Sequence, residues 1–266
     1  MRPGTLSRIG ALVLRYVYLL RASWPRVVEL AYWPTVQMIL WGLISKFFET
    51  NSSFVAHAAG VLIAGVLLWD VLFRGQLGVS VMFFEEIYAR NLTQLFASPL
   101  RPGEMVAGML LVSLLRTLIG TIPAALLAIM LYHYSIFDMG LALIAFFVNL
   151  LVFGWAIGLG ICALVLRYGM GAEGLAWSAI FALAPLSGIY YPIDTLPAMV
   201  RPLAHILPSS HVFEGMRSVL VDGVFRTDLL LGALLLNTVW FALGAFAFLA
   251  VFELARRRGY LLSIGD

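Results

Sequence analysis

Long apolar runs separated by short polar stretches make up most of the chain. A helix needs ~20 residues to cross the ~30 Å hydrocarbon core of a bilayer. The runs therefore predict six membrane-spanning helices, at about residues 28–48, 57–80, 105–132, 139–166, 175–191 and 229–254. Pro34 and Pro185 lie inside the first and fifth runs, which is tolerated where neighbouring helices bond the carbonyl that proline leaves free. We expect one all-α integral membrane domain over residues 1–266.

Residues 1–27 carry an apolar stripe at helical spacing between five arginines. The stripe consists of Leu6, Ile9, Val13, Tyr16, Val17 and Leu20. A basic amphipathic helix of this kind lies in the membrane interface. A mobile basic tail is the alternative, and the regular spacing favours the helix.

Residues 192–223 fit neither a span nor a simple loop. Their apolar runs are short and are interrupted by Pro192, Pro197, Pro202 and Pro208. The pattern predicts short helices that lie on, or re-enter, the outer side of the membrane between the fifth and sixth spans.

Composition supports the bilayer as the solvent. The chain is 62% hydrophobic and 12% charged, against ~45–50% and ~25% for a soluble domain. Its basic residues form no groove-sized cluster, which argues against nucleic-acid binding.

Cys162 is the single cysteine, so no intrachain disulfide is possible. His205 and His211 lie six residues apart with no fitting acidic partner, so we expect no metal site.

The distribution of basic residues predicts the orientation. If the N-terminus is cytoplasmic, eleven of the 17 Lys and Arg residues fall on the cytoplasmic side and four on the outer side. Basic residues are retained on the cytoplasmic side of membrane proteins. We therefore expect both termini in the cytoplasm.

Residues 83–98 form a polar interruption that keeps one apolar helical face. That face consists of Phe84, Ile87, Tyr88, Leu92, Leu95 and Phe96. Ser98-Pro99 ends the predicted helix, because the residue before proline avoids the α conformation. Such a helix covers the ends of the spans, and it is also well placed to receive force from a soluble partner.

Here the sequence resembles the permease subunits of type-2 ATP-binding-cassette (ABC) exporters. The charged helix that ends L-x-x-L-x-x-S-P-L lies between the second and third of six spans. "SGIYYPIDTLP" (187–197) and "LPSSHVFEGMR" (207–217) resemble the exit of the fifth span and the outer re-entrant helices of that family. Permeases that export nodulation factors, drugs and polysaccharides are the most similar members, and the resemblance covers essentially the whole chain.

The resemblance implies a dimer of permeases, each of which docks a cytoplasmic coupling helix onto an ATPase subunit. The residues that match the coupling helix are Glu85, Glu86, Arg90, Leu92, Leu95, Ser98 and Pro99. The chain has no Gly-Lys-Ser/Thr phosphate-binding loop, since its only lysine, Lys46, follows Ser45. We expect ATP and Mg²⁺ to bind a separate ATPase subunit and no cofactor to bind this chain.

The resulting expectation is a multi-pass permease of the bacterial inner membrane, surrounded by lipids, that moves an amphipathic lipid-linked, glycan or drug-like substrate outward. The alternative is a membrane-embedded enzyme or assembly scaffold that works without an ATPase. The chain carries no recognisable catalytic constellation, which weighs against the enzyme.

Polar and aromatic residues in and beside the spans are candidates for a substrate path or gate, because ionisable residues inside a membrane are costly. Asp70 and Arg74 are four residues apart, so they form either a structural pair or part of the path. The aromatic residues are either an interfacial belt or a stacking exit, and the pair in the outer segment is either a loop contact or a gate. The candidates are Asp70, Arg74, Arg116, Trp33, Trp41, Tyr190, Tyr191, Glu214 and Arg217.

Overall fold

The computed structural model describes residues 4–51, 56–92, 94, 98 and 100–257, and the regular elements in these ranges are helical. The α-helices are α1 (Thr5–Ala22), α2 (Trp24–Asn51), α3 (Ala56–Tyr88), α5 (Pro102–Tyr132), α6 (Leu141–Tyr168), α7 (Gly174–Leu183), α8 (Arg201–His205), α9 (Pro208–Arg217) and α10 (Thr227–Arg257). Four single turns connect them: η1 (Ile136–Met139), η2 (Met170–Ala172), η3 (Ile193–Thr195) and the π-helical η4 (Ser218–Asp222).

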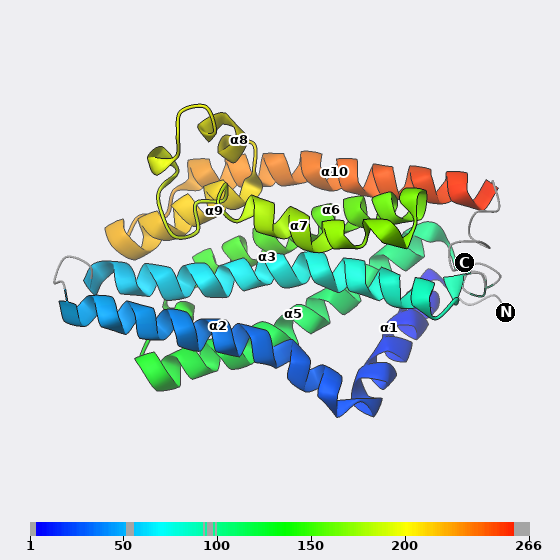
Figure 1. Cartoon of the computed structure of the whole chain (residues 1–266), viewed down its shortest axis with the longest axis horizontal. Coiled ribbons are helices and arrows are strands. Elements are labelled where there is room, and N and C mark those ends of the chain that lie inside the picture. The colour runs from blue at the N-terminus through cyan, green and yellow to red at the C-terminus, as the bar shows by residue number, and fades with distance from the viewer. Residues whose placement is uncertain (1–3, 52–55, 93, 95–97, 99, 258–266) are drawn as a thin grey trace.

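The helices α2, α3, α6 and α10 run roughly side by side along the long axis of the molecule, and α5 crosses this direction at an angle (Figure 1). Within the described residues, α2, α3, α5, α6 and α10 are long and apolar enough to cross a membrane. The start of α1 and the end of α10 lie at the same end of this bundle (Figure 1), which we call the α1 end. The all-α membrane architecture expected from the sequence is therefore confirmed.

The helix α3 lies at the centre of the bundle and packs against α2, α5 and α6. Its closest approach to α6 depends on two glycines four residues apart. A Cβ atom on Gly154 would lie 2.6 Å from the Leu72 carbonyl oxygen, and one on Gly158 would lie 2.8 Å from the Gln76 carbonyl oxygen. Small residues at this spacing let membrane helices pack backbone to backbone.

The predicted fifth span is not a long helix. Residues 175–191 contain α7, which has 10 residues and ends at Leu183. Turns follow, in which Pro185 has no N–H to donate and Gly188 adopts a φ of 66°. Helical hydrogen bonding therefore does not continue to Tyr191, and five of the six expected spans are long apolar helices within the described residues.

The boundary predicted between the second span and the 83–98 helix also differs. The helix α3 continues through both predicted elements to Tyr88, and the chain turns at residues 89–91, where Arg90 has a φ of 51°. Leu92 and Gln94 are helical again, while Leu95 and Pro99 lie outside the described residues. Glu85 and Glu86 therefore belong to the last turn of α3.

The segment over residues 192–223 consists of η3, α8, α9 and η4, grouped at the end of the bundle opposite α1 (Figure 1). The helix α9 packs between α6 and α10 and buries Phe213 and Met216 completely. This burial holds the segment against the spans.

Candidate functional site

Charged residues join α1 to the ends of α3 and α5. Three residues of α1 contact four residues of the spans, and we call this set the α1 joint: Arg8, Arg15, Tyr16, Glu85, Glu86, Glu104 and Arg116. Leu12, Tyr16 and Leu20 form the buried face of α1, one helical turn apart. Tyr16 and Leu20 belong both to this face and to the stripe expected from the sequence, but Leu12 was not in that stripe, and Leu6 and Val17, which were, are 85% and 39% exposed.

Two ion pairs bind α1 to the spans. Arg8 pairs with Glu104 near the start of α5, with Nε 2.7 Å from Oε2. The hydrogen bond to this carboxylate raises the pKa of Arg8. Glu104 also accepts the Arg101 backbone N–H at 2.9 Å, which caps α5. Arg15 lies 2.8 Å from Glu86 at the end of α3.

Tyr16 lies at the centre of the joint. Its hydroxyl donates to the Glu85 carboxylate and accepts a hydrogen bond from Arg116 Nη1 at 3.0 Å. Burial raises the pKa of Tyr16, so the hydroxyl keeps the proton that it donates. One side chain of α1 therefore connects α3 with α5.

The predicted coupling residues occupy different environments. Glu86 is 2% exposed and also accepts a hydrogen bond from Asn91 Nδ2 at 2.8 Å, so it faces the protein. Leu92 is buried, whereas Arg90 and Ser98 lie on the surface. The structure thus brings Glu85 and Glu86 together with α1 and leaves Arg90 and Ser98 exposed.

A cavity of about 430 Å³ opens on the side of the bundle next to the joint, and we call it the side cavity. Three predicted path residues, Trp33, Arg74 and Arg116, line it. Arg26 and Glu29 of α2 add further charges to its wall. Its lining combines cations and carboxylates with an aromatic wall, a chemistry that suits an amphipathic molecule.

Asp70 holds Arg74 in the wall of the side cavity. The two side chains form a buried ion pair, with Arg74 Nε 2.6 Å from Asp70 Oδ2. Gly120 of α5 makes room for it, since a Cβ there would lie 2.6 Å from Arg74 Nε and 2.8 Å from the Leu30 carbonyl oxygen. The pair is structural, and Arg74 also lines the side cavity, so a role of Arg74 in a substrate path stays a prediction.

Sequence reasoning missed the aromatic wall. Phe73 of α3 lies 5.8 Å from Trp177 and 6.1 Å from Phe181, measured between ring centroids, and all three line the side cavity. Trp177 and Phe181 are four residues apart, so they share one face of α7. The four-residue spacing of Trp177 and Phe181 is the sequence signal from which this aromatic wall could have been predicted.

The other predicted path residues hold the segment opposite α1. The rings of Trp41 and Tyr190 stack with centroids 4.4 Å apart, and the Tyr191 hydroxyl donates to the Pro185 carbonyl at 2.7 Å. Arg217 pairs with Glu214 at 2.9 Å and donates to the Gly188 carbonyl at 2.7 Å. These contacts close the turn after α7 and lie apart from the side cavity.

No group of three or more His, Cys, Asp or Glu side chains is arranged as metal ligands within the described ranges.

Comparison with known proteins identifies the family. A model of the family described as ABC-2 type transporter matches residues 16–221. The chain is also 31% identical over 147 residues to ABC transporter G family member 20 of Dictyostelium discoideum. That match covers 54% of this chain and 20% of the relative, so this chain matches about a fifth of the relative's length. The chain belongs to the ABC-2 type transporter family and is a transmembrane component of such a transporter.

Proposed function

We propose that this chain is the permease subunit of an ATP-driven exporter that moves an amphipathic substrate outward. In members of this family the ATPase lies on a separate domain or chain. We assign it here to a separate chain that binds ATP and Mg²⁺, and we pair the permease with a second permease copy.

One observation carries the proposal: the α1 joint and the side cavity share two residues. Glu85 and Arg116 line the cavity, and both also bind the Tyr16 hydroxyl on α1. A displacement of α1 or of the end of α3 therefore moves charged groups in the cavity wall. This shared wall supports mechanical coupling between a cytoplasmic partner and the substrate site.

The geometry refines the role of the coupling residues. Arg90 and Ser98, together with Leu95 and Pro99, form the proposed docking segment for the ATPase, and the buried Leu92 holds that segment against the protein. Glu85 and Glu86 anchor that segment to α1 instead of facing the ATPase, because their carboxylates are occupied by Tyr16, Arg15 and Asn91.

The proposed topology has six crossings of a bacterial inner membrane, with both termini in the cytoplasm. The 10 residues of α7 extend ~15 Å, about half of the hydrocarbon core. The turns that follow, packed through Arg217 and Tyr191, complete the proposed fifth crossing. The position of α1 and the end of α10 at one end of the bundle (Figure 1) supports this topology.

The side cavity favours a substrate with an apolar or aromatic body and an anionic group. Aromatic rings stack on such a body, and Arg26 and Arg116 attract the anion. Large aromatic side chains at its mouth are exposed, with Trp33 at 57% and Phe181 at 61%. A second permease copy that packs over this mouth would enclose the substrate.

Coexpression with the ATPase tests the proposal. The assay measures copurification of the ATPase and ATP-dependent transport in vesicles for the wild type, for Arg90→Glu and for Arg167→Glu as a matched control at the same end of the bundle. We expect Arg90→Glu to weaken copurification about tenfold, and Arg167→Glu to leave it unchanged. A homo-oligomer that binds no ATPase and transports nothing with ATP would refute the proposal and favour the enzyme or scaffold.

A further inference from the structure

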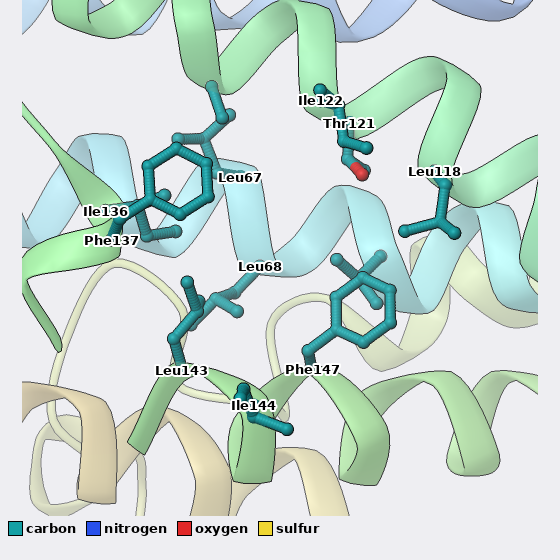
Figure 2. A pocket seen from close by; sticks show the side chains of 12 residues that line it. Leu67, Leu68, Leu118, Thr121, Ile122, Ile136, Phe137, Leu143, Ile144 and Phe147 are labelled. Carbon is teal, nitrogen blue, oxygen red and sulfur yellow. The ribbon is translucent and has the colours of Figure 1, made fainter. Parts of the chain in front are cut away.

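A second cavity lies on another side of the bundle, between α3, α5, η1 and α6. Its volume is about 330 Å³, and we call it the α5–α6 crevice. Figure 2 shows side chains of α5 and α6 on opposite sides of the gap, with the rings of Phe137 and Phe147 at its borders. Its lining residues are Leu67, Leu68, Val71, Leu118, Thr121, Ile122, Ala125, Ile136, Phe137, Leu143, Ile144 and Phe147. The proposed function makes no use of this crevice.

The crevice exists because α5 and α6 separate from each other. Although they follow one another in the chain, α5 packs against α3 and α2, whereas α6 packs against α3 and α10. At the end nearer α1 the two helices are joined by a hydrogen bond of 3.1 Å from Trp155 Nε1 to Ser113 Oγ. At the other end η1 connects them. The gap is therefore closed at both ends and open along its side.

The crevice has a buried floor and an exposed mouth. Its floor is formed by α3, where Leu68 is 1% exposed and Val71 3% exposed. At its mouth Ile122 is 46% exposed and Ile144 60% exposed. The crevice therefore extends between α5 and α6 as far as α3. It is deeper than a groove on the surface of a single helix.

The lining contains no charged side chain and one polar one. The Thr121 hydroxyl donates to the Thr117 carbonyl at 2.9 Å, so its hydrogen is already bonded within α5. A ligand with a polar group inside the crevice would lose its hydrogen bonds to water and gain none. The lining of the crevice therefore suits a hydrocarbon chain.

We propose that the α5–α6 crevice binds one acyl chain of a bilayer lipid, from the leaflet at the end opposite α1. The side of the bundle faces hydrocarbon, and an unfilled crevice would lose the dispersion contacts of its walls. From Leu118 to Ala125, α5 rises ~10 Å, which is most of the ~15 Å thickness of one leaflet. A helix of a partner protein, ~10–12 Å across, is too wide to fill the crevice, because it would cover the mouth without contacting the floor.

The test uses the purified permease alone in vesicles of phosphatidylethanolamine and phosphatidylglycerol. A small fraction of a phosphatidylcholine carries a photoreactive diazirine in the middle of one acyl chain. After illumination, mass spectrometry maps the labelled peptides. We expect label on residues 118–125 and 136–147 at about ten times the level on the exposed face of α10.

Two variants and a matched control test whether the label depends on an open crevice. Ala125→Phe fills the crevice from its buried wall, and Ile144→Trp covers its mouth without altering the floor. Leu126→Phe adds the same ring to the next residue of α5, which is 49% exposed and does not line the crevice. We expect both crevice variants to reduce the label about tenfold and the control to leave it unchanged. Melting temperatures check folding, and Ile144→Trp decides the test if Ala125→Phe does not fold.

Three outcomes would overturn the proposal. The first is label spread equally over the crevice and the exposed faces of other spans. The second is label that neither crevice variant reduces. The third is occupancy of the crevice by a second copy of this chain. In that case Ile122→Cys and Ile144→Cys, in a Cys162→Ala background, would crosslink two chains while the lipid label disappeared. Because no ATPase is present, none of these outcomes bears on the proposed coupling to an ATPase.

Discussion

Arg116 of α5 donates a hydrogen bond to the hydroxyl of Tyr16 on α1, with 3.0 Å between Nη1 and the hydroxyl oxygen. The same hydroxyl donates to Glu85 of α3. Arg116 and Glu85 lie 31 residues apart in the chain, and a residue of a third helix joins them. This arrangement links α1 to two residues that line the side cavity.

Tyr16→Phe tests whether α1 couples the two sites. The variant leaves Arg116 and Glu85 without their shared partner, at a cost of about 1–3 kcal/mol. We expect ATP hydrolysis by the assembled transporter to continue while transport falls about tenfold, as a lost coupling energy of that size implies. The measurement is the ratio of transport to ATP hydrolysis in proteoliposomes. Tyr18→Phe on the exposed face of α1 is the control, and an unchanged ratio in Tyr16→Phe would contradict the coupling role.

Reversal of charge at Arg15 and Glu86 tests the ion pair of the joint. Glu86 is buried and Arg15 is partly exposed, so either single reversal is expected to cost about 1–3 kcal/mol, less than for a fully buried pair. Arg15→Glu combined with Glu86→Arg restores opposite charges and is expected to recover much of the lost stability. Thermal unfolding in detergent measures all three variants. If the double variant were as unstable as the sum of the singles, the pair would not be the stabilising contact.

The buried pair of Asp70 and Arg74 predicts a strongly non-additive mutant cycle. Asp70→Asn leaves a buried guanidinium without its carboxylate, and we expect a loss of about 3–5 kcal/mol. Asp70→Asn with Arg74→Gln removes both charges and is expected to be milder than Asp70→Asn alone. Unfolding in detergent gives the coupling energy. Additive losses would mean that the pair does not act as a unit.

Phe181→Ala tests the aromatic wall of the side cavity. The substitution removes a ring that contacts Phe73, and we expect substrate affinity to fall about tenfold with little change in basal ATP hydrolysis. The apparent KM for transport measures this. As the control, Phe246→Ala on α10 removes a ring that is also largely exposed, at 73% against 61% for Phe181, and lies outside the cavity. Equal effects of the two variants would show that the side cavity does not bind substrate.

Arg217→Ala tests how the segment opposite α1 is held. Arg217 contacts the Gly188 carbonyl and Glu214, so its removal is expected to loosen the turn after α7. Hydrogen exchange of residues 186–196 is expected to increase about tenfold, in line with one lost charge-assisted hydrogen bond. Arg226→Ala, which removes an exposed pair with Asp228, is the control. Unchanged exchange in Arg217→Ala would place the restraint elsewhere.

The sequence by itself determined five long helices and two of the three residues on the buried face of α1. Apolar run length follows the thickness of the bilayer, and helical periodicity places Tyr16 and Leu20 on one face. Both signals are local, so they can be read without knowledge of neighbouring helices. The positions of Trp33, Arg74 and Arg116 near a path were predicted on the same ground, since polar and aromatic residues in spans stand out against their apolar surroundings.

The tertiary structure decided where α7 ends, what Glu86 binds and which residues share a cavity. Hydropathy averages over a window, so it does not register that Pro185 and Gly188 stop a helix inside an apolar run. Arg15 and Glu86 are 71 residues apart, and no local pattern joins them. Their pairing depends on the angle at which α1 crosses the ends of α3 and α5, which the packing of Leu12, Tyr16 and Leu20 sets.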